Sequence, residues 1–123
     1  MTPDCPLALY PMLRRLWGRD TGSKWQPQNP ALSQCSVTAL LVHDLFGGSI
    51  LRTDVNGAWH YYNQVGSRRY DLTMGQFDLP IPYDDLPSSR EEALEDTSVR
   101  QYSVLKERVT AELALSQGDR GLL

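Results

Sequence analysis

The sequence has little of what marks several specialised classes of protein. It has only two cysteines among its 123 residues, Cys5 and Cys35, which are too few and too far apart for the disulfide framework of a small secreted domain. It has no apolar run of roughly 18 residues that would cross a membrane, and no uninterrupted signal-like core in residues 1–24. We therefore expect a cytoplasmic protein that does not enter the membrane and keeps both thiols reduced.

Excess basic charge is also missing. Twelve Lys and Arg residues stand against 15 Asp and Glu residues, which gives a formal net charge of -3 and a pI near 5.2. Proteins that bind nucleic acid usually carry a basic surface, so nucleic acid is not an expected partner. The apolar share of 41% and the charged share of 22% are ordinary for a globular protein, and the length predicts one domain over residues 1–123.

The centre of the chain, residues 25–77, carries the most informative pattern. Before it, the apolar spacing over Leu7 to Trp17 predicts a helix, and residues 19–32 read as a loop rich in Gly, Pro, Gln and Asn. Ser33 is a suitable N-cap, so we expect a helix that continues to Phe46 and ends at a Gly-Gly pair. Because apolar residues occupy most faces of this helix, it should be buried.

Cys35 falls in the first turn of that helix. Unpaired backbone N-H groups and the positive end of the helix dipole lower the pKa of a cysteine there, which makes Cys35 a candidate nucleophile. The alternative is that Cys35 is a small apolar residue of the core, which is the usual role of a lone cysteine.

A hairpin follows, and its turn sets the pairing. Asn56-Gly57 favours a two-residue type I′ turn that places Thr53 opposite His60 and Leu51 opposite Tyr62. The face that holds these four residues carries less charge than the other, so we expect it to pack on the buried helix and bring His60 toward Cys35. The alternative for His60 is a structural histidine on an aromatic strand.

A second turn, near Val65 to Ser67, decides where Asp71 lies. A turn centred between Val65 and Gly66 puts Asp71 directly across from His60, and one centred between Gly66 and Ser67 puts it diagonal to His60 on the same face. A three-residue loop would put the two side chains on opposite faces.

The rest of the chain gives structural signals. Residues 78–87 hold three prolines and three aspartates and predict an extended segment without strong chemistry. Ser88 or Ser89, followed by Glu91 or Glu92, predicts a capping box at the start of a C-terminal helix over about 89–115.

Several strings of this sequence closely resemble the small bacterial YunG-like proteins. They are Trp25, Asn29-Pro30, Gln34-Cys35-Ser36-Val37-Thr38-Ala39-Leu40, Asp44-Leu45-Phe46-Gly47-Gly48, His60-Tyr61-Tyr62-Asn63, Tyr70-Asp71-Leu72-Thr73 and Gln76-Phe77. In order and context, Cys35, His60 and Asp71 are also similar to the papain and transglutaminase-like superfamily. That second resemblance implies a compact α+β fold, in which a central helix bearing the cysteine packs on a small antiparallel sheet, with N- and C-terminal helices.

The residue pattern and the resemblance to the papain and transglutaminase-like superfamily together predict a cysteine hydrolase or acyltransferase. It would act on an amide or thioester carbonyl of a peptide, protein or small molecule. Cys35 would form an acyl-enzyme, His60 would be the base and Asp71 would orient it, with Gln34 supporting the oxyanion. We expect no cofactor. The residues expected to contact substrate are Trp25, Trp59, Tyr61, Tyr62 and Asn63.

Two other classes of function stay open. The same core could be a non-catalytic interaction module that binds a partner protein through its aromatic face. A metal site built from Cys35, His60 and Asp71 is weaker, because the sequence has no closely spaced ligand pair.

Overall fold

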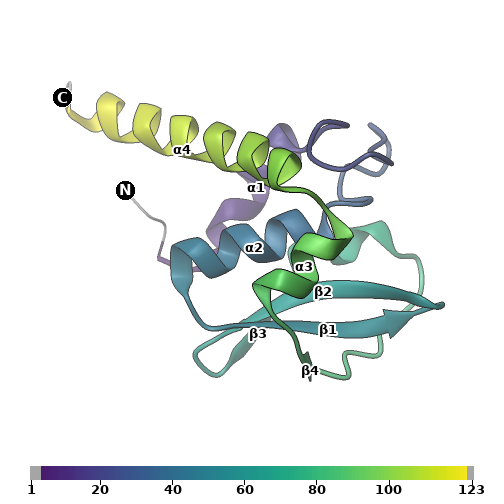
Figure 1. Cartoon of the computed structure of the whole chain (residues 1–123). Coiled ribbons are helices and arrows are strands. Elements are labelled where there is room, and N and C mark those ends of the chain that lie inside the picture. Colours follow the sequence, from purple (N-terminus) through teal and green to yellow (C-terminus); the bar gives the residue numbers. More distant parts are fainter. Residues whose placement is uncertain (1–3, 122–123) are drawn as a thin grey trace.

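The computed structural model describes the backbone of residues 4–121 and the side chains of residues 4–115. It has an α+β fold in which the long C-terminal helix, a central helix and a small antiparallel sheet form successive layers (Figure 1). This confirms the expected class and the central helix packed on a sheet. None of the helices in the described part of the chain is long and apolar enough to cross a membrane.

The N-terminal helix lies where its apolar spacing predicts. A 3-10 turn, η1 (Pro6–Leu9), leads into α1 (Tyr10–Leu16), and Pro11 falls in the first turn, where its missing N-H breaks no helical hydrogen bond. The backbone becomes extended at Trp17. Leu9, Leu13 and Trp17 are buried and attach this helix to the core.

The central helix, α2 (Cys35–Phe46), is buried over its first eight residues, as its apolar faces predict. The predicted cap is wrong, however. Ser33 adopts the left-handed backbone region, with φ of 63°, and its hydroxyl accepts a hydrogen bond from the backbone N-H of Lys24 at 3.0 Å. The helix consequently begins at Cys35, which is its first residue.

The sheet has the order β3-β2-β1-β4. Strands β1 (Ser49–Val55) and β2 (Ala58–Val65) pair in the predicted register, with positive φ at both Asn56 and Gly57 as a type I′ turn requires. Strand β3 (Arg68–Tyr70) pairs with β2 about a turn centred between Gly66 and Ser67, which is the second of the predicted alternatives. A two-residue strand, β4 (Leu86–Pro87), pairs with β1.

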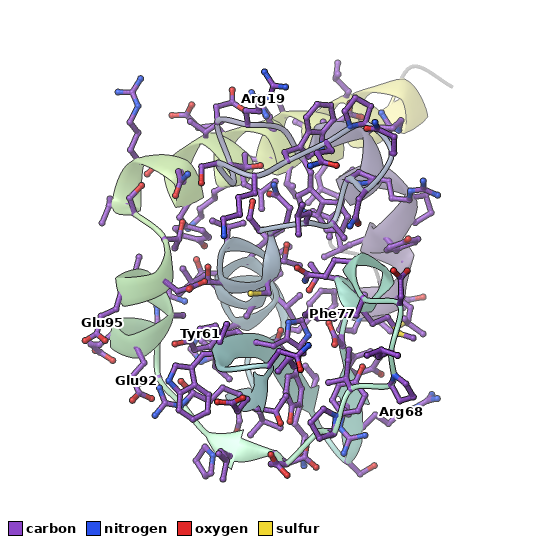
Figure 2. The ribbon with its side chains drawn as sticks, turned by 90° about the vertical axis from the view of Figure 1, so that its right-hand side faces the viewer. Arg19, Tyr61, Arg68, Phe77, Glu92 and Glu95 are labelled. Carbon is purple, nitrogen blue, oxygen red and sulfur yellow. The ribbon has the colours of Figure 1, made fainter. Side chains whose placement is uncertain are left out.

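The prediction of which sheet face meets α2 is wrong. Ile50 and Tyr61 belong to the core around α2, and Asn63 donates a hydrogen bond from Nδ2 to the Ala39 carbonyl at 3.0 Å. Viewed end-on in Figure 2, α2 has Tyr61 directly beneath it. The opposite face, which carries His60 and Tyr62, is covered by the crossing segment, residues 77–87.

The predicted C-terminal helix is two helices. Ser89 caps α3 (Arg90–Asp96) by accepting a hydrogen bond from the Glu92 N-H, which confirms the capping signal. The chain then breaks at Thr97 and Ser98, and the Ser98 hydroxyl caps α4 (Val99–Gly121) at the Gln101 N-H. Another short 3-10 turn, η2 (Met74–Gln76), follows β3. The break after Asp96 places the end of α3 close to the start of α2.

Candidate active site

The strongest contact at the site joins a histidine and a carboxylate. His60 Nε2 lies 2.6 Å from Asp71 Oδ2, and the two side chains are only 2% and 3% exposed. Asp71 stands one residue beyond β3, so the register of the second hairpin puts it diagonal to His60. One of the alternatives for the second turn, at Gly66-Ser67, therefore predicted the approach of these two residues, which are 11 positions apart in the sequence.

The carboxylate of Asp71 is held from both sides. Oδ1 accepts from the backbone N-H of Thr73 at 3.1 Å and from its hydroxyl at 3.3 Å, while Oδ2 also accepts from the Tyr83 hydroxyl at 2.9 Å. Burial, together with the neighbouring Asp71 charge, raises the pKa of Tyr83, so the phenol keeps its proton and remains a donor. Tyr83 lies in the segment predicted to carry no chemistry and was missed from the sequence.

This network fixes the proton on His60. An ionised carboxylate only accepts hydrogen bonds, so Nε2 carries the hydrogen that points to Asp71. The other ring nitrogen, Nδ1, is buried and has no hydrogen-bond partner among the described residues. The ring of Phe77 packs edge-on against the imidazole at 4.9 Å between centroids. In the neutral ring, Nδ1 is thus a hydrogen-bond acceptor that is fixed in position and has no donor among the described residues.

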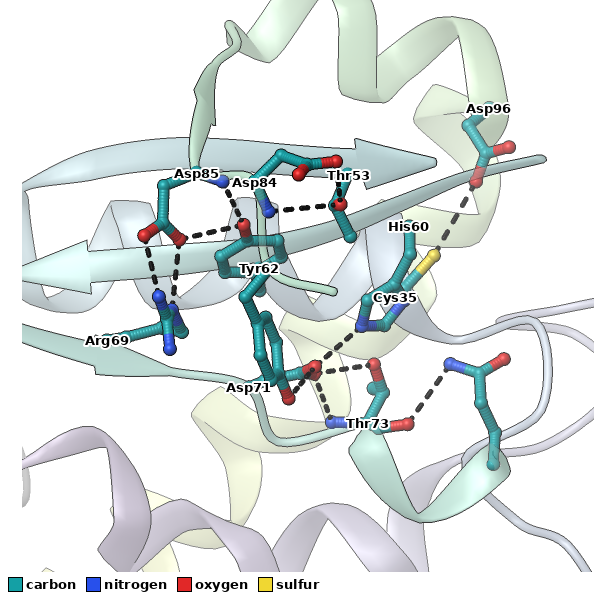
Figure 3. Close-up of polar contacts among 12 residues, drawn as sticks. Cys35, Thr53, His60, Tyr62, Arg69, Asp71, Thr73, Asp84, Asp85 and Asp96 are labelled. Carbon is teal, nitrogen blue, oxygen red and sulfur yellow. Dashed lines mark hydrogen bonds and ion pairs between the residues drawn. The ribbon is translucent and has the colours of Figure 1, made fainter. Parts of the chain in front are cut away.

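Cys35 and His60 line the same cavity, which has a volume of about 380 Å³. Figure 3 draws the Cys35 side chain beside the His60 ring. The cavity lies at the end of β2 nearest the first hairpin turn, and its walls include parts of the loop before α2, of that hairpin and of the α3–α4 connection. Cys35 is 8% exposed, so the sulfur is mostly covered.

The short third strand explains why both residues reach this place. Strand β3 ends at Tyr70, opposite Asn63, so no strand among the described residues pairs with the remaining part of β2 on that side. Cys35 occupies this open edge, where the backbone N-H of Tyr61 faces its sulfur. Side chains from both sheet faces can enter the cavity at such an edge, as Trp59 and His60 do.

The electrostatics at Cys35 differ from the expectation for a helix start. Burial raises the pKa of the Cys35 thiol to about 12, and the negative charges of Asp96 and Asp71 act in the same direction. Hydrogen bonds from the backbone of Tyr61 and Ser36 oppose this rise without cancelling it. The predicted lowering of the Cys35 pKa is therefore wrong, because desolvation outweighs the helix terminus.

Asp96 is a charged group in direct contact with the sulfur. Cys35 Sγ donates toward Asp96 Oδ2 at 3.9 Å, and Figure 3 shows this contact on the other side of Cys35 from Asp71. Asp96 is the last residue of α3 and is exposed at the cavity wall. No local pattern could have identified it, since its approach depends on the unpredicted break between α3 and α4.

Gln34 does not reach the site. Its side chain is fully buried, Oε1 accepts from the Thr21 hydroxyl at 2.7 Å, and Nε2 donates to the carbonyls of Gly18 and Leu32, both at 3.3 Å. Both amide hydrogens are thus occupied, so the expected oxyanion role of this side chain is wrong. Gly22 permits the arrangement, because a Cβ there would lie 2.5 Å from Gln34 Nε2. Gln34 instead fixes the loop that leads into α2.

Of the five residues expected to contact substrate, only Trp59 lines the cavity. It is 41% exposed, and the Arg52 guanidinium lies 4.0 Å from its ring centre. The other four have structural places. Tyr61 donates to the Glu92 carbonyl, Tyr62 to Asp85 and Asn63 to Ala39, while Trp25 packs at the edge of the core.

Metal binding gains no support from the side chains. Among residues 4–115, no group of three or more His, Cys, Asp and Glu residues is arranged to hold a metal ion. His43, the second histidine, lies near the end of α2 and contacts Arg90 at 3.1 Å, away from the cavity.

Comparison with known proteins identifies relatives of this chain. No solved structure matches it. It is 47% identical over 96 residues to a Bacillus subtilis (strain 168) protein described as "Uncharacterized protein YunG". The aligned region covers 78% of this chain and 84% of that protein. The family described as "YunG protein" matches residues 6–114. The chain therefore belongs to the YunG family.

Proposed function

We propose that this protein is a cysteine-dependent acyl-transferring enzyme, a hydrolase or acyltransferase with a papain-like arrangement of Cys35, His60 and Asp71. One observation carries the proposal: a buried His60–Asp71 pair leaves Nδ1 without a partner in a ring that shares a cavity with Cys35. A buried nitrogen acceptor without a partner is costly, and such exceptions concentrate where a group is needed for chemistry.

The first half of the reaction would proceed at Cys35. His60 Nδ1 accepts the thiol proton while Sγ attacks the carbonyl carbon of an amide or thioester, and a carbon-sulfur bond forms. The carbonyl π electrons move to oxygen and give a tetrahedral oxyanion. When that intermediate collapses, the bond to the leaving amine or thiol breaks and His60 returns the proton to the leaving atom, so an acyl-enzyme remains.

The second half regenerates the thiol. Water or an amine attacks the thioester carbonyl, His60 takes the proton of the nucleophile, and Sγ leaves as the acid or amide product forms. Asp71 accepts the Nε2 hydrogen throughout and stabilises the imidazolium that forms transiently. The backbone N-H groups in the first turn of α2 are the oxyanion donors in this proposal, since the Gln34 amide is committed to the loop.

The raised pKa of Cys35 determines how the proton moves. A thiol with a pKa of about 12 is neutral at physiological pH, so the proton transfer to His60 must accompany the attack instead of preceding it. Cys35 would then react slowly with simple alkylating reagents until a carbonyl substrate fills the cavity.

Acyl-enzyme formation tests the proposal. In a Cys5→Ser background, where Cys35 is the single thiol, p-nitrophenyl acetate should transfer one acetyl group to the protein, as seen by intact mass and peptide mapping to Cys35. His60→Gln should slow this transfer by roughly 10³-fold, since members of such a unit act together. His43→Gln removes the other histidine and should leave the rate unchanged. Acetylation of Cys35 at an equal rate without His60 would overturn the proposal.

A non-catalytic interaction module is the second candidate. The observation in its favour is the covered sulfur with a raised pKa, which also suits a structural cysteine. The two functions differ in one respect, because a structural cysteine can be replaced by Ala or Ser without a specific loss of chemistry. If Cys35→Ser binds and reacts like the unaltered protein in every acyl-transfer assay, the module is the better account.

A further inference from the structure

Asp96 holds an unusual position among the acidic residues of this protein. Several others form ion pairs, for example Asp85 with Arg69 at 2.6 Å and Asp44 with Arg90 at 2.8 Å. Within residues 4–115, no Lys or Arg side chain lies within 4.0 Å of the Asp96 carboxylate. It is exposed at the cavity, where its carboxylate accepts from the Cys35 thiol and also meets the side chain of Ser36.

Two acceptors therefore compete for the thiol hydrogen. Cys35 Sγ donates toward Asp96 Oδ2, while His60 Nδ1 in the same cavity has no partner among the described residues. A hydrogen bond to Asp96 keeps the proton on sulfur and adds an unfavourable charge beside any thiolate. The attack that we assign to Cys35 requires the other partner, His60.

We propose that Asp96 is the specificity residue of this site and binds a protonated amine that lies within a few bonds of the reacting carbonyl. This inference rests on the proposed function and names its substrate class: carbonyl compounds that carry an alkylammonium group, such as α-amino acyl derivatives. The ammonium N-H groups replace the thiol at the carboxylate, and Cys35 is released to donate to His60. The same contact neutralises the charge that disfavours the thiolate, so the correct substrate activates its own nucleophile.

Asp96 is the one carboxylate in the cavity lining within the described part of the chain, so no other acid there would bind the substrate cation. Lys24, on the loop before α2, is the one Lys or Arg of the lining within the described chain; its positive charge acts on Asp96 without forming an ion pair with it. The remaining lining near the sulfur is mostly neutral, and includes Phe77, Trp59 and Thr97. A substrate cation therefore has one strong acceptor close to Sγ, and that acceptor is Asp96.

Thiol reagents that differ only in charge test the inference without any acyl transfer. The probes are 2-aminoethyl, 2-hydroxyethyl and 2-sulfonatoethyl methanethiosulfonate, which are cationic, neutral and anionic. Each transfers its alkylthio group to Cys35 as methanesulfinate leaves. Rates in the Cys5→Ser background would be measured by intact mass and divided by the rates with free 2-mercaptoethanol, which removes the intrinsic difference among the reagents.

The corrected rates should fall from the cation to the neutral reagent to the anion, by roughly three- to tenfold at each step at low salt. Asp96→Asn should bring all three within about twofold of one another and should speed the neutral reagent, because the thiolate loses a negative neighbour. Asp96→Glu should keep part of the preference. Glu95→Gln, an exposed carboxylate on the same helix that does not line the cavity, should leave it unchanged.

Equal corrected rates in the unaltered protein, or a preference that Asp96→Asn leaves intact, would overturn the inference. Failure of the proposed function has a different signature, which is acetylation of Cys35 that does not depend on His60 while the charge preference persists. Melting curves of each variant show whether the fold is kept; since Asp96 is exposed, its replacement by Asn should not unfold the protein.

Discussion

The two faces of the sheet are built in different ways. On the face toward α2, Ile50 and Tyr61 join an apolar core in which Leu40 is fully buried. On the other face, Thr53, His60 and Tyr62 are also buried. The crossing segment provides the hydrogen-bond partners of Thr53 and Tyr62, and Asp71 provides the partner of His60 Nε2, which leaves His60 Nδ1 without one. Packing holds the first face, and a polar network holds the second.

This difference shows how the fold can exclude His60 from solvent and still fix the orientation of its ring. A buried polar network is specific because each member needs a partner with the right geometry. The crossing segment contributes Asp84 and Asp85, which bond to Thr53 and Tyr62 (Figure 3), and Tyr83, which donates to the carboxylate of Asp71. Changes on the polar face should therefore affect chemistry more than stability, and changes on the apolar face should do the reverse.

The largest effect is expected from Asp71→Asn on the polar face. An asparagine amide can donate to Nε2, which moves the ring hydrogen to Nδ1 and removes the acceptor for the thiol. We expect acetylation of Cys35 to slow by about 10⁴-fold, as measured with p-nitrophenyl acetate. Asp84→Asn is the matched control, because Asp84 bonds to Thr53 on the same face and not to His60. A loss of similar size in the control would mean that the network responds as a whole.

The next effect concerns the covered sulfur itself. With a pKa raised to about 12, Cys35 should react with iodoacetamide roughly 10³-fold more slowly at pH 8 than a free thiol such as N-acetylcysteine. Only the thiolate reacts, and below the pKa its fraction rises about tenfold per pH unit. The reaction rate of Cys35 should therefore increase about tenfold per pH unit from pH 7 to about pH 10 without reaching a plateau. A plateau already reached near neutral pH would instead reveal a preformed thiolate–imidazolium pair.

A cavity on the apolar face should mainly reduce stability. Leu40→Ala removes a fully buried side chain from α2 and should lower the free energy of unfolding by about 2–5 kcal/mol, as measured by urea denaturation. The rate of Cys35 acetylation per folded molecule should change little. Leu79→Ala, at a residue that is 71% exposed, should leave stability within about 0.5 kcal/mol. A large loss of acetylation rate in folded Leu40→Ala protein would contradict the expectation that the apolar face affects stability more than chemistry.

The smallest effect compares one hydroxyl from each face. Tyr83→Phe and Tyr61→Phe each remove a single hydrogen bond, to Asp71 at 2.9 Å and to the Glu92 carbonyl at 3.2 Å. Each should cost about 1 kcal/mol in the free energy of unfolding. Only Tyr83→Phe should also slow Cys35 acetylation, by roughly three- to tenfold, because it loosens the carboxylate that orients His60. Equal kinetics in the two variants would remove Tyr83 from the positioning network.

Local signals predicted much of the site. The Asn56-Gly57 turn fixes the partner of every residue in the first hairpin, and the second turn then leaves few places for Asp71. What the sequence could not reveal depends on contacts between distant segments. The number of charged residues on each sheet face predicted the wrong face against α2, because the crossing segment provides polar partners on the face of His60.

Cys35 illustrates the same limit. Its place in the first turn of a buried helix follows from local pattern, but its electrostatics depend on how deeply that turn is covered and on a carboxylate 61 positions later. Likewise, Gln34 looked available beside the cysteine, and only the folded loop shows that its amide is fully used. Long-range burial, more than residue type, decides these roles.

The early end of β3 has one more consequence. If the hairpin continued past Tyr70, Leu72 would reach the main chain of Tyr61 and the ladder would gain further rungs, as isolated sheets favour. The sulfur of Cys35 would then lose the main-chain edge against which it rests. A longer hairpin would thus occupy the backbone edge that Cys35 now contacts, so we expect natural variation that lengthens the hairpin to coincide with replacement of Cys35.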